Sequence, residues 1–248
     1  MRTPDHVGDS TWASEHPEPA APQVAGLVEV LHDPESIIRQ TAAHALGLYR
    51  DPQAVDALAH ALQDPEPEVR ERAAWALGVI REARAAEALV AALDDATPAV
   101  ARAAALALGG LAAARAHAPL LTALADPTRP LEVRSAAASA LGHLRATVAL
   151  PALLAAMQNP DRSLRAAAAT ALGRLGALQA VEALLTALDD PAESVRRAAV
   201  EALGALGDAR AMAPVARLRE DPAWMLRQAA AHAWATLRRL GQTDGGVP

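Results

Sequence analysis

The chain has 248 residues and a formal net charge of −6, and its 67 alanines and 34 leucines make up about two-fifths of it. It contains no cysteine and no lysine, so all 23 basic residues other than histidine are arginines. The missing thiol excludes cysteine nucleophiles, disulfides and cysteine-bound metal clusters, and the missing amine excludes Schiff-base and phosphate-loop lysines. Alanine and leucine are strong helix formers and only 2% of the residues are aromatic, so we expect helices with thin packing.

The chain begins with residues 1–21, a segment that contains several prolines and shows no helical period. We expect this segment to form a disordered N-terminal tail. Three interpretations of its Trp12 remain open: a short docking motif, a ring that packs on the first repeat, or an incidental aromatic residue. The segment lacks the apolar core of a signal peptide, and no apolar run in the chain has the length of a membrane span. We therefore predict a cytoplasmic protein with no membrane partner.

From residue 22 onward the sequence is periodic, and the clearest marker is a recurring Leu-Gly dipeptide. Its glycines are Gly47, Gly78, Gly109, Gly142, Gly173 and Gly204. Successive glycines are 31 residues apart, except for one interval of 33, and a seventh copy reads Trp234-Ala235. This spacing indicates an internal repeat. We expect the glycines, and alanine pairs such as Ala73-Ala74, to allow neighbouring backbones to approach closely.

Each period contains two stretches with apolar residues at helical spacing, and an Asp-Pro or Asn-Pro turn separates them in six copies. The Asx side chain of the turn is suited to cap the second helix, with the proline at its first position. The third copy departs from this pattern, because it reads Asp95-Ala96 and its proline is delayed to Pro98. The seven first helices are predicted near residues 22–32, 53–63, 84–94, 116–125, 148–158, 179–189 and 210–220.

This repeating sequence pattern resembles HEAT repeats, in the short 31-residue subtype that is also named for phycobilisome lyases. The resemblance covers residues 22–240. It implies an all-α fold, a right-handed α-α superhelix (solenoid) of seven HEAT-like helix pairs. Residues 241–248 are rich in glycine and are predicted to form a flexible C-terminal tail.

The diagnostic residues of the resemblance are the turn Asp and an Arg six positions later. In the family these groups form a ladder of bonds between successive repeats. A row of arginines is also typical of a phosphate-binding stripe, but each of these has a turn Asp or Asn of its own and the chain is acidic. We therefore assign them a structural role and expect no nucleic-acid partner. The third copy has Ala101 where the Arg belongs, and an insertion around Thr128-Arg129-Pro130 stretches the fourth. The predicted ladder comprises Asp33, Arg39, Asp64, Arg70, Asp126, Arg134, Asn159, Arg165, Asp190, Arg196, Asp221 and Arg227.

A functional surface is expected at the positions that vary between copies, because a solenoid buries the positions that its repeats share. Resemblance to HEAT proteins implies that the second helices line a concave groove. Large apolar residues gather at the N-terminal end of this groove, and Trp75 is either a binding anchor or a side chain that leans onto a neighbouring repeat. The predicted partner-binding residues are His44, Leu48, Arg72, Trp75, Val79, Leu106, Ser139, His143, Thr170, Arg174, Arg197, Glu201 and His232.

Catalytic and metal-binding patterns are weak in this sequence. His44, His143 and His232 belong to repeats one, four and seven, so at about 10 Å per repeat they do not converge on one ion. We predict no catalytic residue, no metal site and no cofactor. The function expected first is a non-catalytic scaffold that binds a peptide or helix of a protein partner in the groove. The alternative is a phycobilin-lyase-like protein, in which Trp75, His44 and Arg72 would grip the chromophore.

Overall fold

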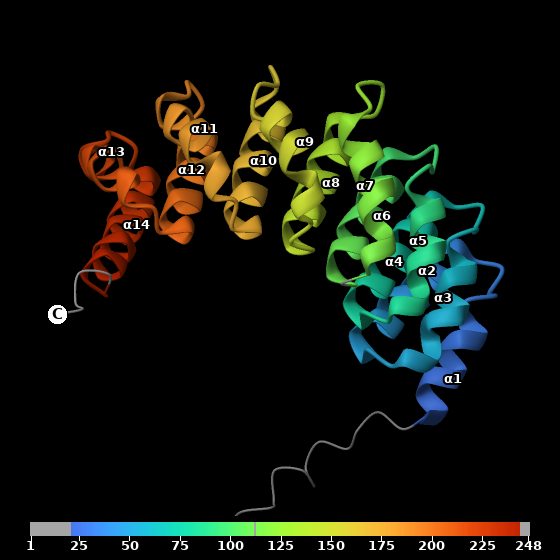
Figure 1. Ribbon diagram of the computed structural model, residues 1–248. Coiled ribbons are helices and arrows are strands. Elements are labelled where there is room, and N and C mark those ends of the chain that lie inside the picture. Colours follow the sequence, from blue (N-terminus) through green and yellow to red (C-terminus); the bar gives the residue numbers. More distant parts are fainter. Residues whose placement is uncertain (1–20, 112, 244–248) are drawn as a thin grey trace, which may run out of the picture.

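The computed structural model describes residues 21–111 and 113–243, with side chains described for residues 23–111 and 113–240. Trp12 and most residues of the two predicted tails lie outside the described residues. Within those residues the structure is a solenoid of seven helix pairs with no strand. Figure 1 shows the pairs following one another along an arc, with α8, α10, α12 and α14 on its inner side and α7, α9, α11 and α13 on its outer side. The predicted all-α solenoid is confirmed.

The inner layer consists of the second helix of each pair. Each inner helix contacts the inner helix of the next repeat. The apolar stripe of each one therefore faces a neighbouring repeat as well as its own first helix. These helices are α2 (Ser36–Tyr49), α4 (Pro67–Ile80), α6 (Pro98–Gly110), α8 (Leu131–His143), α10 (Arg162–Leu175), α12 (Glu193–Leu206) and α14 (Trp224–Thr243).

The outer layer consists of the first helices, which are shorter. They are α1 (Ala21–Val30), α3 (Val55–Ala61), α5 (Ala86–Ala92), α7 (His117–Ala125), α9 (Leu150–Ala156), α11 (Val181–Thr186) and α13 (Met212–Arg217). From the second repeat onward a short 3₁₀ turn precedes each of them: η2 (Pro52–Ala54), η3 (Ala83–Ala85), η4 (Ala114–Ala116), η5 (Thr147–Ala149), η6 (Leu178–Ala180) and η8 (Ala209–Ala211). Two further 3₁₀ turns follow the last two outer helices, η7 (Ala187–Asp189) and η9 (Leu218–Glu220).

The last helix extends beyond the predicted end of the solenoid. We placed that end at residue 240, before Gly241, but α14 continues to Thr243. A single glycine lowers helix propensity by about 1 kcal/mol, which does not by itself end a helix that is already formed.

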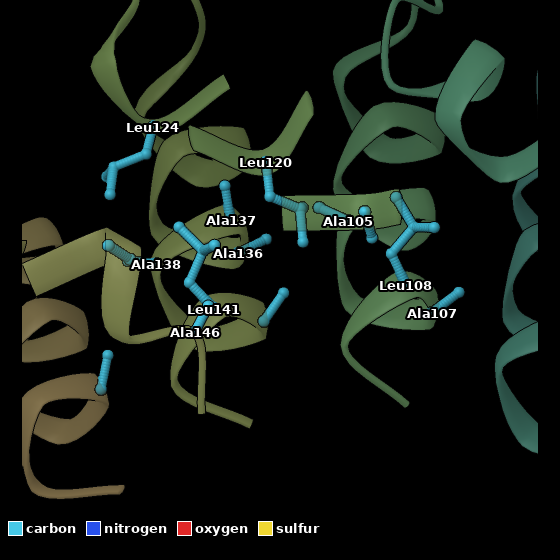
Figure 2. Packing of buried hydrophobic residues seen from close by; sticks show 14 of the residues in the cluster. Ala105, Ala107, Leu108, Leu120, Leu124, Ala136, Ala137, Ala138, Leu141 and Ala146 are labelled. Carbon is cyan, nitrogen blue, oxygen red and sulfur yellow. The ribbon is translucent and has the colours of Figure 1, made fainter. Parts of the chain in front are cut away.

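Leucine and alanine fill the space between the layers. Figure 2 shows these side chains from α6, α7 and α8 meeting between neighbouring repeats, with Leu108, Leu120 and Leu141 among them. All three leucines are fully buried. No polar or charged residue belongs to the buried set among the described side chains, so burial of apolar surface is the main source of stability.

The Leu-Gly glycines set the distance between successive inner helices. A Cβ atom built on each of the six would lie 2.6–2.9 Å from the nearest atom of an alanine in the next inner helix. For Gly142 that atom is the backbone Cα of Ala171, at 2.6 Å. Any larger residue would therefore force two backbones apart. The expected close approach is confirmed at these positions.

The turn Asx residues act differently from the capping role that we expected. In all seven repeats the Oδ1 atom of the turn residue accepts a hydrogen bond from the backbone N–H two residues later, at 2.8–2.9 Å. The inner helix begins after that Asx turn, so the expected helix cap and first-position proline of the Asx-Pro pair were wrong. In the second and third repeats it is Pro67 and Pro98 that occupy the first turn of the helix. The cap at α10 is Asp161, two residues beyond Asn159.

The ladder arginines join successive repeats. Arg165 donates from Nη1 to the backbone oxygens of Asn159 and Pro160 in its own turn, at 2.9 and 2.8 Å. Its Nε and Nη2 atoms donate to both carboxylate oxygens of Asp190 in the next repeat, at 2.7 and 2.8 Å. Arg39 with Asp64, and Arg70 with Asp95, form the same bidentate contact. Asp95 was absent from the predicted ladder. Such charge-assisted pairs are geometrically specific.

The other predicted ladder residues make weaker or different contacts. Arg196 lies 3.9 Å from Asp221. Arg227 donates to the backbone oxygens of Asp221 and Pro222 in its own turn, both at 2.8 Å. Arg134 donates to the backbone oxygen of Leu124 at 3.0 Å.

The junction between repeats three and four is held by a residue of the insertion. Ala101 offers no guanidinium there, and Asp126 instead accepts hydrogen bonds from Thr128. Arg129 reaches back to the preceding turn, where it donates to the backbone oxygen of Leu93 at 2.5 Å and pairs with the Asp94 carboxylate. The missing contact is thus replaced by one that runs in the opposite direction along the chain.

The glycine contact predicts the first stability result. Gly142→Ala is expected to lower the free energy of unfolding by about 1–3 kcal/mol, because the added methyl group meets the backbone of Ala171 and overpacks the interface. The control is Gly26→Ala in α1, where an added Cβ meets nothing within 4 Å. That variant should gain about 0.5–1 kcal/mol from helix propensity. Urea unfolding of both variants measures the difference, and equal effects would contradict the packing argument.

The ladder predicts a pH-dependent result. Hydrogen bonds from Arg165 hold the pKa of the Asp190 carboxyl below its usual value. The carboxylate therefore stabilises the fold above its unfolded-state pKa of about 3.9, and this contribution is lost as the pH falls through the lower folded-state pKa. Asp190→Asn should cost about 1–3 kcal/mol at pH 7, and this cost should shrink progressively as the pH falls below about 4. Asp221→Asn, at the longer 3.9 Å contact, should cost less at pH 7. Thermal unfolding across this pH range checks both, and a pH-independent deficit in Asp190→Asn would contradict the assignment.

Candidate functional site

The predicted groove residues all lie on inner helices. Each of the thirteen is partly or fully exposed, so none belongs to the buried core. Two pockets open along this surface. One lies between α4 and α6 and the other between α12 and α14. One opening thus lies in the N-terminal half of this surface and the other at its C-terminal end.

The α4–α6 pocket has a largely apolar lining. It has a volume of about 260 Å³. Leu106 and Val79 form much of its apolar wall, and Leu106 is 46% exposed. The nine residues that line it are Glu71, Arg72, Trp75, Gly78, Val79, Arg102, Ala103, Leu106 and Ala107.

Trp75 contacts the preceding repeat and also borders this pocket. Its ring stacks on that of His44, with the ring centroids 4.7 Å apart. It also covers Gly47 so closely that a Cβ there would lie 2.6 Å from the indole. The rest of the side chain lines the pocket with Leu106. Of the two alternatives that we left open for Trp75, the contact with a neighbouring repeat is observed, and the role of binding anchor stays a prediction.

His44 is held by this stacking. Its Nδ1 atom is buried and has no hydrogen-bond partner among the described residues. A buried polar atom without a partner costs free energy, so the position of the imidazole depends on its contact with Trp75. Leu48, one turn further along α2, is 64% exposed and extends the apolar end of the groove.

Two charged residues at the pocket were missed by the sequence reasoning. Arg102 pairs with Glu71 across the pocket wall at 3.2 Å, and each is only partly exposed. They occupy the position that directly follows the ladder position, a column from which we had included only Arg197 in the predicted surface. Arg72 is exposed and forms no ion pair with any described residue.

The middle of the groove is lined by polar side chains. The Nδ1 atom of His143 lies 2.9 Å from the backbone oxygen of Ser139. Arg174 approaches the same imidazole at 3.5 Å. Thr170 is partly exposed beside them. These side chains are all polar.

The C-terminal part of the groove contains the second pocket, of about 490 Å³ between α12 and α14. Glu201 and His232 lie on its wall. Arg197 forms a 3.5 Å ion pair with Glu201 within α12. The structure thus brings Arg72, Trp75, Val79 and Leu106 together at one pocket, and places Glu201 and His232 at another.

Neither a metal cluster nor a membrane span is found in the part of the chain that the structure describes. No group of three or more His, Asp or Glu side chains there is arranged to hold an ion. None of the described helices combines the length and hydropathy needed to cross a bilayer. The histidines at positions 44, 143 and 232 lie in separate repeats, as expected.

Comparison with solved structures shows similarity to other helical repeat proteins. The complex of CpcE and CpcF of phycocyanin lyase from Nostoc sp. PCC7120 matches with a TM-score of 0.61 and 24% identity, over 98% of this chain and 99% of that chain. The Escherichia coli protein YibA matches with a TM-score of 0.54 and 18% identity, over 96% of this chain and 100% of that one. An engineered protein matches with a TM-score of 0.54 and 22% identity, over 87% and 68% of the two chains. At these identities the likeness concerns the fold.

Comparison of sequences gives the family. No curated protein matches the chain. The family model for HEAT repeats matches residues 24–108, 86–164 and 150–235. These matches cover most of the chain and agree with the stacked helix pairs of the structure. The chain therefore belongs to the HEAT-repeat family.

Proposed function

We propose that this protein is a non-catalytic adaptor that binds a peptide or helix of a partner protein along its inner helices. The observation that carries the proposal is the open α4–α6 pocket with Leu106 exposed on its wall. An apolar opening flanked by charged side chains is typical of a protein-binding site in which one anchor side chain is buried.

The size of the pocket favours a side chain over a free small molecule. Small-molecule sites usually enclose roughly 300–1,000 Å³ and cover most of the ligand surface. The α4–α6 pocket has about 260 Å³ and is open to one side. It suits one leucine-sized or aromatic group whose backbone stays outside, in the groove.

The repeat pattern supports the same surface. Shared positions of the repeat are used for packing: glycines for the inner-helix contact and arginines for the ladder. The positions that vary between copies are exposed on the inner helices. Specificity for one partner is therefore expected at these variable positions.

Substitution of one groove leucine is expected to weaken partner binding without unfolding the protein. Leu106→Asp is expected to reduce partner capture at least about tenfold, because it places a charge in the apolar anchor pocket. Leu131→Asp is the matched control: Leu131 is 42% exposed, compared with 46% for Leu106, and starts α8 at the turn edge. The measurement is affinity capture from source lysate on both variants and wild type, with quantitative mass spectrometry.

Thermal unfolding of the same three proteins controls for folding. Both substitutions replace exposed leucines, so the midpoints should stay within a few degrees of wild type. A protein that is retained by wild type and Leu131→Asp but lost by Leu106→Asp supports the groove. If every captured protein is retained equally by the two variants, the groove proposal is wrong.

A phycobilin-handling protein is the second candidate. The observation that favours it is the likeness in fold to the phycocyanin lyase complex over nearly the whole length of both chains. Trp75 and Arg72 share one pocket, and His44 stacks on Trp75, so the three residues proposed to grip a chromophore are neighbours.

Absorption spectroscopy separates this candidate from the adaptor. Under the adaptor proposal, mixing the protein with phycocyanobilin should leave the visible spectrum equal to that of free bilin up to about 100 μM protein, a range that detects weak binding. A shifted, saturable band that disappears in Trp75→Ala would establish the second candidate instead.

A further inference from the structure

We infer that the segment bound in the groove is acidic, and that its carboxylates meet a row of arginines along one rim of the inner helices. This inference rests on the proposed function and specifies the chemistry of the partner. The row consists of Arg50, Arg81 and Arg145, which occupy the same position in repeats one, two and four. We call it the arginine rim.

The backbone at the rim is the first observation. All three arginines have positive φ angles, of 55°, 64° and 50°, at the C-terminal ends of α2, α4 and α8. The corresponding positions of repeats five and six are Gly176 and Gly207, at 73° and 74°. This left-handed conformation disfavours residues that have a Cβ. The chain therefore places arginine in three repeats where glycine is the less strained residue.

The direction of the side chains is the second observation. Arg81 lies beside Gly110 of the next inner helix, with its Nε atom 3.9 Å from the Cβ position of that glycine. Arg145 donates from Nε to the backbone oxygen of Arg174, at 3.1 Å. Gly110 and Arg174 occupy the same groove position in their repeats. Each of these two rim arginines thus extends over the edge of the groove of the following repeat.

The charge balance is the third observation. Arg50, Arg81 and Arg145 are exposed, and none of them forms an ion pair with a described residue. On the groove itself the acids Glu71 and Glu201 are already paired with Arg102 and Arg197. Exposed arginines without an ion-pair partner among the described residues remain, although the whole chain carries a net charge of −6.

The acids of the inner helices lie mainly at the opposite edge. Carboxylates flank the N-terminal ends of these helices, where their negative charge interacts favourably with the helix dipole. Examples are Glu35, Glu66, Glu68, Glu132 and Glu193. Asp51 and Glu82 directly follow Arg50 and Arg81, but the three rim arginines form no ion pair with any described residue and so carry the uncompensated positive charge at this edge. A partner with carboxylates on one side matches this arrangement, and a basic partner does not.

The repeat spacing sets the spacing of those carboxylates. Packed inner helices are about 8–10 Å apart. An extended chain advances about 10 Å in three residues, and a helix does so in about seven. Repeat three has alanine at the rim position, so the second interval spans two repeats. The partner should thus present Asp or Glu at about positions i, i+3 and i+9 if it is extended, or i, i+7 and i+21 if it is helical. A bulky apolar residue beside the acids would enter the α4–α6 pocket, next to the rim residues of repeats one and two.

Peptide selection tests this chemistry without knowledge of the natural partner. The full chain is used to select from a random library of 16-residue peptides displayed on phage, at about 50 mM salt, where surface charges are weakly screened. Enrichment of Asp and Glu around one bulky apolar residue is expected. The affinity of a selected peptide, measured by fluorescence anisotropy, should fall at least about tenfold in the triple variant Arg50→Gly, Arg81→Gly, Arg145→Gly.

The same triple variant tests whether the arginines are there for stability. Glycine relieves the left-handed conformation, so the midpoint of thermal unfolding should stay equal or rise. If the midpoint falls while peptide affinity is unchanged, the arginines serve the helix ends and the inference is wrong. Removing three exposed, unpaired arginines elsewhere gives the control for net charge. In the variant Arg115→Gln, Arg162→Gln, Arg217→Gln, peptide affinity should stay within about twofold.

The outcomes separate this inference from the proposed function. Selected peptides without an acidic bias, lost in Leu106→Asp but retained in the arginine-rim variant, would overturn the inference and leave the groove intact. If no selected peptide is lost in Leu106→Asp, the groove proposal itself fails. Binding of a 20-nucleotide oligothymidine that is tighter than any peptide, and lost in the rim variant, would identify a nucleic-acid site and overturn the inference.

Discussion

The contact between a glycine on one inner helix and an alanine on the next is the constraint on which the rest of the structure depends. It occurs at six successive junctions, with so little space that a single added methyl group would meet a neighbouring alanine at 2.6–2.9 Å. Close helix contact allows a chain made largely of alanine and leucine to form a dense core with almost no aromatic residues. It also fixes the spacing of everything attached to the inner helices. The groove, the rim and the ladder share that spacing.

The ladder adds specific polar contacts between successive repeats to this apolar packing. Each bidentate arginine contact joins one turn to the next, and the partly buried pairs resist sliding of one repeat past its neighbour. Where Ala101 interrupts the series, Arg129 supplies a contact from the other side. The chain therefore keeps a link between repeats three and four, although the residues that make it differ. Because packing and ladder use the shared positions, the variable positions are free to serve recognition.

Much of the fold was predictable from the sequence because the same packing pattern recurs in every copy of the repeat. The period, the helix pairs and the role of the Leu-Gly glycines follow from seven aligned copies. The Asx turns were misassigned because an Asx-Pro pair fits either a turn or a helix start, and only the backbone shows which. Asp95 was missed because its own repeat has Ala101 in place of the ladder arginine, and Arg129 was missed because it lies in an insertion and contacts the preceding turn. The left-handed conformation of Arg50 is likewise invisible in the residue type, since arginine gives no local signal for it.

The candidate site was predictable only in part. The columns of variable residues indicate a surface, and Trp75 stands out among them because aromatic residues are rare. The pocket beside Trp75 depends on the side chains of two helices, and the ion pair between Glu71 and Arg102 that borders it joins two repeats. Sequence spacing does not show which way these side chains turn. The double contact of Trp75, with His44 on one side and the pocket on the other, follows only from three-dimensional packing.

The residues of each repeat fall into those that build the solenoid and those that we propose recognise a partner. A saturation mutagenesis scan of the full chain, with folded abundance and binding of a selected peptide read in parallel, tests this division most directly. We predict that substitutions at the Leu-Gly glycines and their facing alanines lower abundance and binding together, whereas substitutions at the groove and the arginine rim lower binding alone. The account would be contradicted if the substitutions that affect binding alone clustered on the outer helices, or if those in the groove reduced abundance as much as binding.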